Sequence, residues 1–314
     1  MAADGARQWW IRPAIRLGAA ALLPVAVPAV ITGLIWALPG DPASLICPPE
    51  ICSGTEQLAA RWNLDQGPVH FFLSWLSDAA SGDFGKSWRI QQGSPVTPLL
   101  LTAIPHTAAL VGLALSLLLA GALGAATRVL PARADSLLSA VGLIPTVVMS
   151  LAAAAAVSIN YGASAFDAEA VRVKILLGAL ALGLADSALA GAARGVRSIF
   201  ESERQRRYVQ MGILRGEGVL SNAWPNAAPA IAGQMRARTL HLLSGAVVVE
   251  VVLQIEGLGD LLWSGTLAQD FGVVLAATFG FALLSGSLLL AQAAVEIAVA
   301  MHVRRSPPVR EVAA

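Results

Sequence analysis

Six long apolar stretches constrain this 314-residue sequence more than any other feature. A helix needs ~20 predominantly apolar residues to cross the ~30 Å hydrocarbon core of a bilayer. The stretches cover residues 17–38, 107–130, 136–159, 174–200, 229–249 and 273–303. Lipid offers no partner to backbone polar groups, so each stretch is expected to cross as a helix. The sequence therefore predicts an all-α, polytopic integral membrane protein with six transmembrane helices.

Composition supports a membrane protein and excludes an ordinary soluble one. Hydrophobic residues make up 56% of the chain and charged residues 13%, against roughly 25% charged in soluble domains. The first apolar stretch exceeds the ~7–15 residues of a signal-peptide core, so we expect it to remain as a span. Prolines inside the stretches, at positions 24, 28 and 145, predict kinks beside neighbouring helices.

The distribution of Lys and Arg predicts the orientation. In the six-span arrangement one side holds 14 of the 21 basic residues and the other side holds 5. The richer side has Arg7, Arg12, Arg16, Arg128, Arg133, Arg194, Arg197, Arg204, Arg206, Arg207, Arg215, Arg304, Arg305 and Arg310. Cytoplasmic loops are the ones that carry excess Lys and Arg. Both termini are therefore predicted to lie in the cytoplasm.

Two connections between the apolar stretches are long. Residues 39–105 form an extracytoplasmic loop with Trp, Phe and turn signals, which we expect to be folded. Residues 194–226 form a basic cytoplasmic loop. No composition shift marks a separate soluble domain, so residues 1–314 are interpreted as a single transmembrane domain.

Motifs for nucleotide hydrolysis and for metal binding are not evident. Gly85-Lys86-Ser87 resembles the end of a phosphate-binding loop, but the glycine required five residues earlier is replaced by Ala80. The four histidines are scattered, whereas a metal enzyme needs three or four converging ligands. The net charge of +1 gives no indication of a nucleic-acid partner. We expect no catalytic residues, no metal and no cofactor in this chain.

Several motifs, in order and spacing, resemble a known family. The first half contains Leu38-Pro39-Gly40-Asp41-Pro42-Ala43, Leu64-Asp65-Gln66, Gly82-Asp83-Phe84-Gly85 and Pro95-Val96. The second half contains Tyr208-Val209, Trp224-Pro225-Asn226-Ala227-Ala228-Pro229, Gly245-Ala246-Val247-Val248-Val249-Glu250, Gly257-Leu258-Gly259 and Asp270-Phe271. Together they resemble the permease subunits of bacterial ABC importers for dipeptides, oligopeptides and nickel.

The resemblance implies a function and a set of partners. Such permeases form the translocation pathway in the bacterial cytoplasmic (inner) membrane and pair with a second permease subunit. They sit on two ATPase subunits, which bind ATP and Mg²⁺, and receive substrate from an extracytoplasmic solute-binding protein. Peptide is the substrate expected first, with nickel or another small solute as alternatives. An ion-coupled secondary transporter is the alternative from a different class.

By resemblance, residues 194–226 are the loop that couples to the ATPase subunits. The residues assigned to it are Tyr208, Gly212, Leu214, Arg215, Gly216, Glu217, Pro225 and Asn226. Counting from Tyr208 places the family's characteristic glycine at Gly216, and counting back from Pro225-Asn226 places it at Gly212. The two registers differ by four residues, about one helical turn. This difference predicts a one-turn deletion in the loop.

Ionisable residues inside apolar stretches are costly and usually face a partner or a wet cavity. At 1.5 Å per residue, Asp186 and Arg238 reach similar depths from opposite membrane surfaces. We hypothesise that they form an ion pair, with Arg236 as the alternative partner. Arg238 and His241 share a helix face and could line the pathway, whereas His241 could equally be packed and Arg236 could extend to the headgroups.

Two further features lie on the predicted outer side. Glu250 opens an acidic connection that either lines the mouth of the pathway or forms a solvated turn. Cys47 and Cys52 lie in an oxidising compartment if the protein is bacterial, which favours a local disulfide.

Overall fold

The computed structural model describes residues 11–46, 54–126 and 132–305, and the regular secondary structure in these ranges is helical apart from one isolated bridge between Lys86 and Pro95. The elements are α1 (Ile11–Ala37), α2 (Pro42–Ile46), α3 (Thr55–Arg61), α4 (Gly67–Ala80), α5 (Thr97–Ala126), α6 (Ala132–Val141), α7 (Thr146–Tyr161), η1 (Gly162–Ser164), α8 (Ala168–Leu184), η2 (Ala185–Ser187), α9 (Ala188–Arg204), α10 (Arg207–Leu214), α11 (Val219–Leu253), α12 (Leu258–Leu267) and α13 (Phe271–Arg305). The predicted all-α class is confirmed for these residues.

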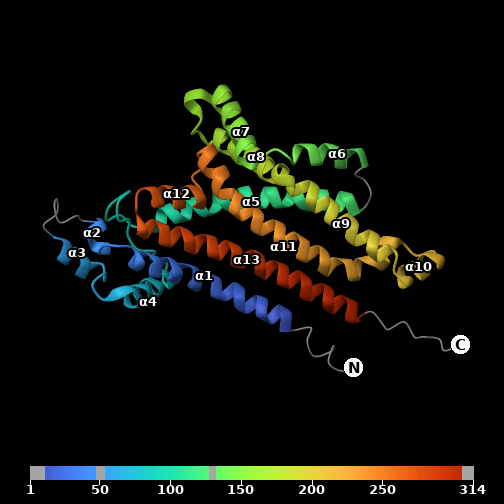
Figure 1. Ribbon diagram of the computed structural model, residues 1–314, viewed down its shortest axis with the longest axis horizontal. Helices are drawn as coiled ribbons and strands as arrows, with labels where there is room; N and C mark the ends of the chain where they lie inside the picture. The colour runs from blue at the N-terminus through green and yellow to red at the C-terminus, as the bar shows by residue number, and fades with distance from the viewer. Residues whose placement is uncertain (1–10, 47–53, 127–131, 306–314) are drawn as a thin grey trace.

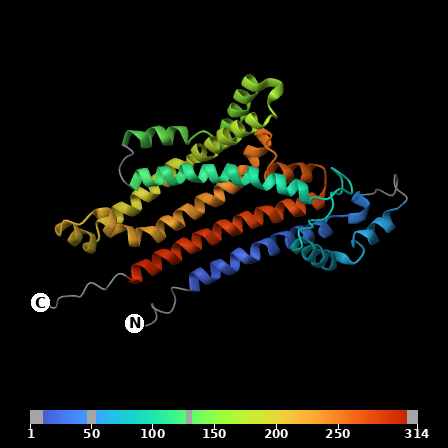
Figure 2. The same cartoon turned by 180° about the vertical axis from the view of Figure 1, so that it is seen from behind.

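The long helices lie side by side as an elongated bundle (Figures 1 and 2). Helix α13 packs along α1 on one side and α11 on the other, and α9 packs between α5 and α11. Small residues allow the close contacts: a Cβ atom on Gly286 would stand 2.9 Å from the carbonyl oxygen of Ala20. Glycine at such contacts is typical of helices that associate within lipid.

Four helices are long and apolar enough to cross a membrane, and the number rises to six if each of two sharply bent helix pairs is one span. The first bent pair is α6 with α7, at 82°, and the second is α11 with α12, at 72°. The third predicted span, over residues 136–159, is divided between the two helices of the first bent pair. Pro145, which disfavours helix in the residue before it, precedes α7, so the predicted kink is a complete break.

Helix boundaries also differ from the prediction. Helix α5 begins at Thr97, inside the predicted 39–105 loop. The predicted 194–226 loop is largely helical, because α9 continues to Arg204, α10 follows, and α11 begins at Val219. Prolines 225 and 229 lie inside α11 and do not mark its start. These helices extend beyond the apolar stretches as amphipathic segments, which apolar length alone does not predict.

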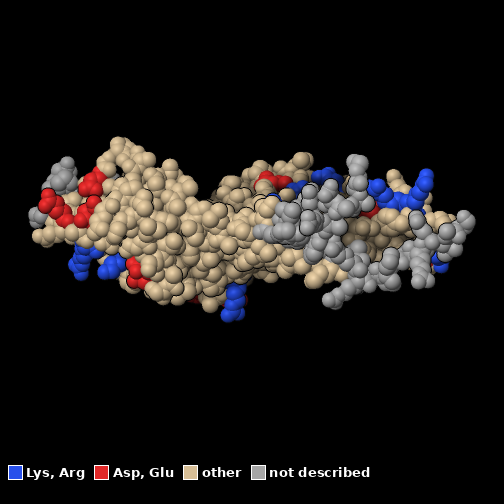
Figure 3. All heavy atoms as spheres, turned by 90° about the horizontal axis from the view of Figure 1, so that it is seen from below, with Lys and Arg blue, Asp and Glu red and all other residues tan. Residues whose placement is uncertain are grey.

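The two ends of the bundle differ in structure. Helices α2–α4 gather at one end, and α10 lies at the opposite end, where α1 begins and α13 ends (Figure 1). On the face drawn in Figure 3, a broad uncharged surface covers much of the left half of the bundle, and most charged groups lie toward the two ends, apart from some near the middle of the edges. This arrangement is the one expected of a bundle that crosses an apolar layer.

Candidate functional site

Helices α10 and α11 form a hairpin whose turn is built by glycine. Gly216 has φ +79° and directly follows Arg215, the residue that caps the C-terminal end of α10. The N–H of Gly216 donates to the carbonyl of Ile213 at 2.9 Å, and the N–H of Glu217 donates to that of Gly212 at 3.0 Å. This pair of bonds is the Schellman motif, in which a left-handed residue ends a helix.

Gly212, the other candidate for the family's characteristic glycine, has a different structural role. A Cβ atom on Gly212 would stand 2.4 Å from Nδ2 of Asn222 on α11. Gly212 therefore allows α10 to approach α11, whereas Gly216 makes the turn between them. Both glycines that the sequence left as alternatives therefore take part in the hairpin, in different ways.

Side-chain contacts hold this hairpin in place. Glu217 accepts hydrogen bonds from Nδ2 of Asn222 at 2.8 Å and Nε of Arg215 at 2.9 Å. These two donors, Asn222 first, lower the pKa of Glu217. The Tyr208 hydroxyl donates to the carboxylate of Glu203.

The environment of Tyr208 shifts the pKa of its hydroxyl upward. Partial burial and the contact with Glu203 raise the pKa of Tyr208, and the side chain of Asn226 opposes them. Pro225 lies half-buried on α11 next to Asn226. The structure thus brings Tyr208 and Asn226 together from the two helices of the hairpin.

The tip of the hairpin exposes large apolar side chains. Leu214 is 80% exposed and Met211 57% exposed. Tyr208, Ile213, Leu220 and Trp224 are also exposed. Exposed apolar groups that cluster among polar ones mark protein-interaction surfaces. We refer to these six residues as the tip surface.

Asp186 lies at a break between α8 and α9. Asp186 and Ser187 have φ values of 49° and 57°, which interrupt the predicted continuous span over residues 174–200. The Ser187 N–H donates to the carbonyl of Gly142 at 2.8 Å, and the Asp186 N–H donates to that of Ile144 at 3.2 Å. The hydroxyl of Thr146 donates to the Asp186 carboxylate. Two helix breaks therefore satisfy each other's backbone groups, as the interior of a bilayer requires.

The hypothesised ion pair between Asp186 and Arg238 is not formed within residues 132–305. Asp186 is engaged by Thr146, and the guanidinium of Arg238 lies against α9, where a Cβ atom on Gly191 would stand 2.2 Å from its Nη2. The depth estimate assumed straight helices, and the break at Asp186 invalidates that assumption.

The remaining cationic candidates on α11 do not form one cluster. Arg236 lies half-buried toward α13, at a small cleft with Gln292. His241 is exposed. Their predicted roles in a translocation pathway stay predictions.

Glu250 is buried at the end of α11, contrary to the alternative of a solvated turn. Its side chain is fully buried, and the N–H of Gly259 donates to its Oε2 at 2.6 Å. A Cβ atom on Gly257 would stand 2.3 Å from the Glu250 carboxyl carbon, and one on Gly259 would stand 2.8 Å from its Oε2. The two glycines of Gly257-Leu258-Gly259 therefore make room for this carboxylate where α11 bends into α12.

A long-range polar contact with four donors involves Asp270, which the sequence marked as part of a family motif. Its buried carboxylate accepts hydrogen bonds from the N–H groups of Trp88 at 2.8 Å, Arg89 at 3.0 Å and Ile90 at 2.9 Å, and from the Ser87 hydroxyl. Burial acts to raise the pKa of Asp270, but these four donors outweigh it and lower the pKa. Asp270 thereby ties the predicted outer loop to the start of α13.

Cys47 and Cys52, the candidate disulfide, lie outside the described residues. Groups of three or more His, Cys, Asp or Glu side chains arranged to hold a metal ion do not occur in the described part of the chain.

Comparison with known proteins identifies relatives of one kind. No protein-family model matches the chain. The oligopeptide transport system permease protein AppB of Bacillus subtilis (strain 168) is 26% identical over 267 residues, 78% of this chain and 84% of that protein. The glutathione transport system permease protein GsiC is 28% identical over 261 residues in Shigella boydii and in Escherichia coli (strain K12), 78% of this chain and 83% of that protein. The chain is therefore a homologue of oligopeptide and glutathione transport permeases, and its resemblance to the peptide ABC permease family is confirmed.

Proposed function

We propose that this chain is the permease subunit of an ATP-driven importer of peptides. The observation that carries the proposal is the similarity to oligopeptide and glutathione permeases over 78% of the chain. The substrates named for these relatives are both peptides, since glutathione is a tripeptide. In this proposal the chain forms the pathway together with a second permease subunit, and an extracytoplasmic solute-binding protein delivers the peptide.

Energy would come from two separate ATPase subunits that bind ATP and Mg²⁺ and dock on the tip surface. Leu214 and Met211 expose apolar side chains there, and Arg215 and Arg207 stand beside them. An apolar centre with a polar and basic border is typical of a protein interface. The α10–α11 hairpin, closed by the Gly216 turn and the Glu217 contacts, is rigid enough to transmit movement to α11 as a unit.

The orientation follows from the same assignment. If α10 contacts ATPase subunits, the ends of α1 and α13 at that end of the bundle are cytoplasmic, and α2–α4 are extracytoplasmic. The excess of Lys and Arg toward the termini and α10 supports this orientation. The membrane would be the cytoplasmic (inner) membrane of a bacterium.

Site-directed crosslinking tests the docking surface. In a chain with Cys47 and Cys52 replaced by Ser, Leu214→Cys is compared with Val69→Cys, which is 71% exposed on α4 at the opposite end. Co-expressed ATPase subunits from the same organism should crosslink through position 214 and not through position 69. An intact complex that crosslinks at position 69 and not at 214 would refute the proposal.

A further inference from the structure

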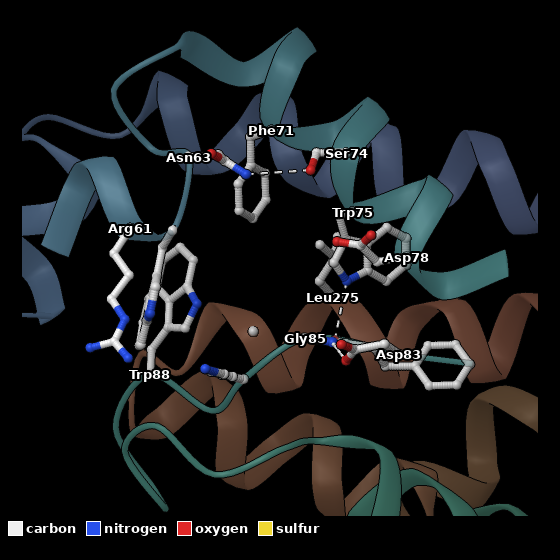
Figure 4. A pocket seen from close by; sticks show the side chains of 14 residues that line it. Arg61, Asn63, Phe71, Ser74, Trp75, Asp78, Asp83, Gly85, Trp88 and Leu275 are labelled. Carbon is white, nitrogen blue, oxygen red and sulfur yellow. Dashed lines mark hydrogen bonds between the residues drawn. The ribbon is translucent and has the colours of Figure 1, made fainter. Parts of the chain in front are cut away.

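A cavity of about 190 Å³ opens at the end of the molecule that carries α2–α4. It lies between α3, α4, the segment 83–88 and the start of α13 (Figure 4). Pockets for drug-sized ligands span roughly 300–1,000 Å³. This cavity therefore suits a smaller molecule, and it is separate from the tip surface at the other end of the bundle.

The walls of the cavity are aromatic and held in place. Trp75 and Trp88 are buried, and the ring of Phe71 lies 6.3 Å from that of Trp88 in an edge-on arrangement. Nε1 of Trp75 donates to the carbonyl of Phe84 at 3.2 Å. The backbone of Trp88 is fixed by Asp270. The rings consequently present preformed apolar faces, which reduces the entropy lost when a ligand binds.

Four charged side chains line the cavity: the cations Arg61 and Lys86 and the carboxylates Asp78 and Asp83. In Figure 4, Arg61 lies on the side of Trp88, and Asp78 and Asp83 lie on the side of Trp75 and Gly85. The guanidinium of Arg61 and the carboxylate of Asp78 form no ion pair or hydrogen bond with the residues described in this end of the chain. Both groups are exposed and face the same cavity, so they are available to a ligand.

We propose that this cavity binds a small zwitterion whose opposite charges are separated by an apolar middle, as in a dipeptide with free termini. The ammonium group lies at Asp78 and Asp83, the carboxylate lies at Arg61, and the side chain packs on Trp75 and Trp88. A single amino acid holds its ammonium and carboxylate groups on one carbon, so it separates the two charges by less than a dipeptide does. The choice of a peptide as the ligand rests on the proposed function. The cavity would add to that function a site where the peptide first binds on the outer face.

Calorimetric titration of the purified full chain with glycyl-L-leucine tests the proposal without any transport step. Three blocked or shortened ligands serve as comparisons: N-acetylglycyl-L-leucine lacks the ammonium group, glycyl-L-leucinamide lacks the carboxylate, and L-leucine lacks the length. The free dipeptide should bind at least tenfold more tightly than each of them, because each removes one charge-assisted contact or its reach.

Two variants assign the ends of the ligand. Arg61→Gln should weaken dipeptide binding at least tenfold and remove the preference over glycyl-L-leucinamide. Asp78→Asn should weaken binding and remove the preference over the N-acetyl compound. Asp65→Asn, an exposed acidic residue of the same loop outside the cavity, should bind as the unmodified chain does. These paired losses of selectivity are not expected from a general loss of structure.

Absence of dipeptide binding at 10 mM, or equal binding of free and blocked ligands, overturns the proposal. So does dipeptide binding that neither Arg61→Gln nor Asp78→Asn alters. ATP-dependent peptide uptake by the assembled importer without binding to this chain would sink the cavity proposal alone. Dipeptide binding without ATP-dependent uptake would sink the proposed function alone.

Discussion

The carboxylate of Asp270 accepts a hydrogen bond from the backbone N–H of Trp88, 2.8 Å away and 182 residues earlier in the sequence. The same carboxylate bonds the Val273 N–H at 3.2 Å, at the start of α13. One buried side chain thus joins a loop to the first turn of the last long helix. A movement of the loop must move the end of α13 or break these bonds.

Removing this carboxylate should destabilise the outer end of the molecule. Asp270→Ala leaves the N–H groups of Trp88 and Val273 buried without their acceptor. Each unsatisfied group lowers the free energy of unfolding by about 1–3 kcal/mol. We expect a melting temperature several degrees lower in detergent, measured by intrinsic fluorescence. Glu256→Gln, an exposed acidic position in the neighbouring connection, is the control and should melt as the unmodified chain does. Equal melting of all three proteins would mean that Asp270 does not hold this region.

The same carboxylate predicts an acid-sensitive contribution to stability. Because its pKa in the folded protein lies below the ordinary value of 3.8, folding favours the ionised form. Its contribution is fully present above about pH 4 and is lost as the pH falls through the lowered pKa. A melting profile against pH should therefore fall below about pH 4, and Asp270→Asn should reduce that fall. Identical profiles for the two proteins would contradict the assignment.

The bend between α11 and α12 should depend on the pairing of Gly257 with Glu250. The three atoms nearest to a methyl group at position 257 all belong to the Glu250 carboxylate, so Gly257→Ala should destabilise the chain by ~1–3 kcal/mol. In a chain that already carries Glu250→Ala, Gly257→Ala should lower the free energy of unfolding by much less. A double-mutant cycle in thermal unfolding measures this coupling.

Gly259 provides the matched comparison for this cycle. A Cβ atom there would also stand 2.5 Å from the backbone Cα of Val247, which Glu250→Ala leaves in place. Gly259→Ala should therefore stay destabilising in the Glu250→Ala background. Gly233→Ala on α11, with no atom within 4 Å of the added carbon, should be neutral or stabilising. Equal costs for Gly257→Ala with and without Glu250 would contradict the account.

The contact between Asp186 and Thr146 can be distinguished from an ion pair by substitution. Asp186→Asn keeps an oxygen that can accept the Thr146 hydroxyl, so its effect should be within ~1 kcal/mol. The charge swap Asp186→Arg with Arg238→Asp should not restore folding yield, because the two side chains are not in contact. Size-exclusion chromatography of the solubilised variants measures the yield. Recovery in the swap, but not in either single variant, would revive the ion pair.

Sequence reasoning succeeded where one segment determined its own structure. Apolar length located the long helices, and Pro145 located the break before α7. It failed where two distant segments determined the structure together. Nothing local to Asp186 and Ser187 indicates that their backbone N–H groups donate to Ile144 and Gly142, and the hydrogen bond from Ser87 to Asp270 joins positions 183 residues apart.

The candidate sites divide in the same way. The motifs left Gly212 and Gly216 as alternatives for one position, and the structure shows that Gly212 makes a helix contact and Gly216 a turn. Glu250 was expected near water because the residues after it are acidic. It is buried because Gly257 and Gly259 fold back over it, and Asp270 was recognisable only as part of a motif.

Uptake by reconstituted vesicles tests the central claim most directly. The account predicts that labelled peptide accumulates only when this chain, its partner permease, the ATPase subunits, the solute-binding protein and ATP are all present. Vesicles that contain this chain alone should not accumulate peptide, with or without an ion gradient. Accumulation against a concentration gradient by the chain alone would contradict the claim that its movement is driven by separate ATPase subunits.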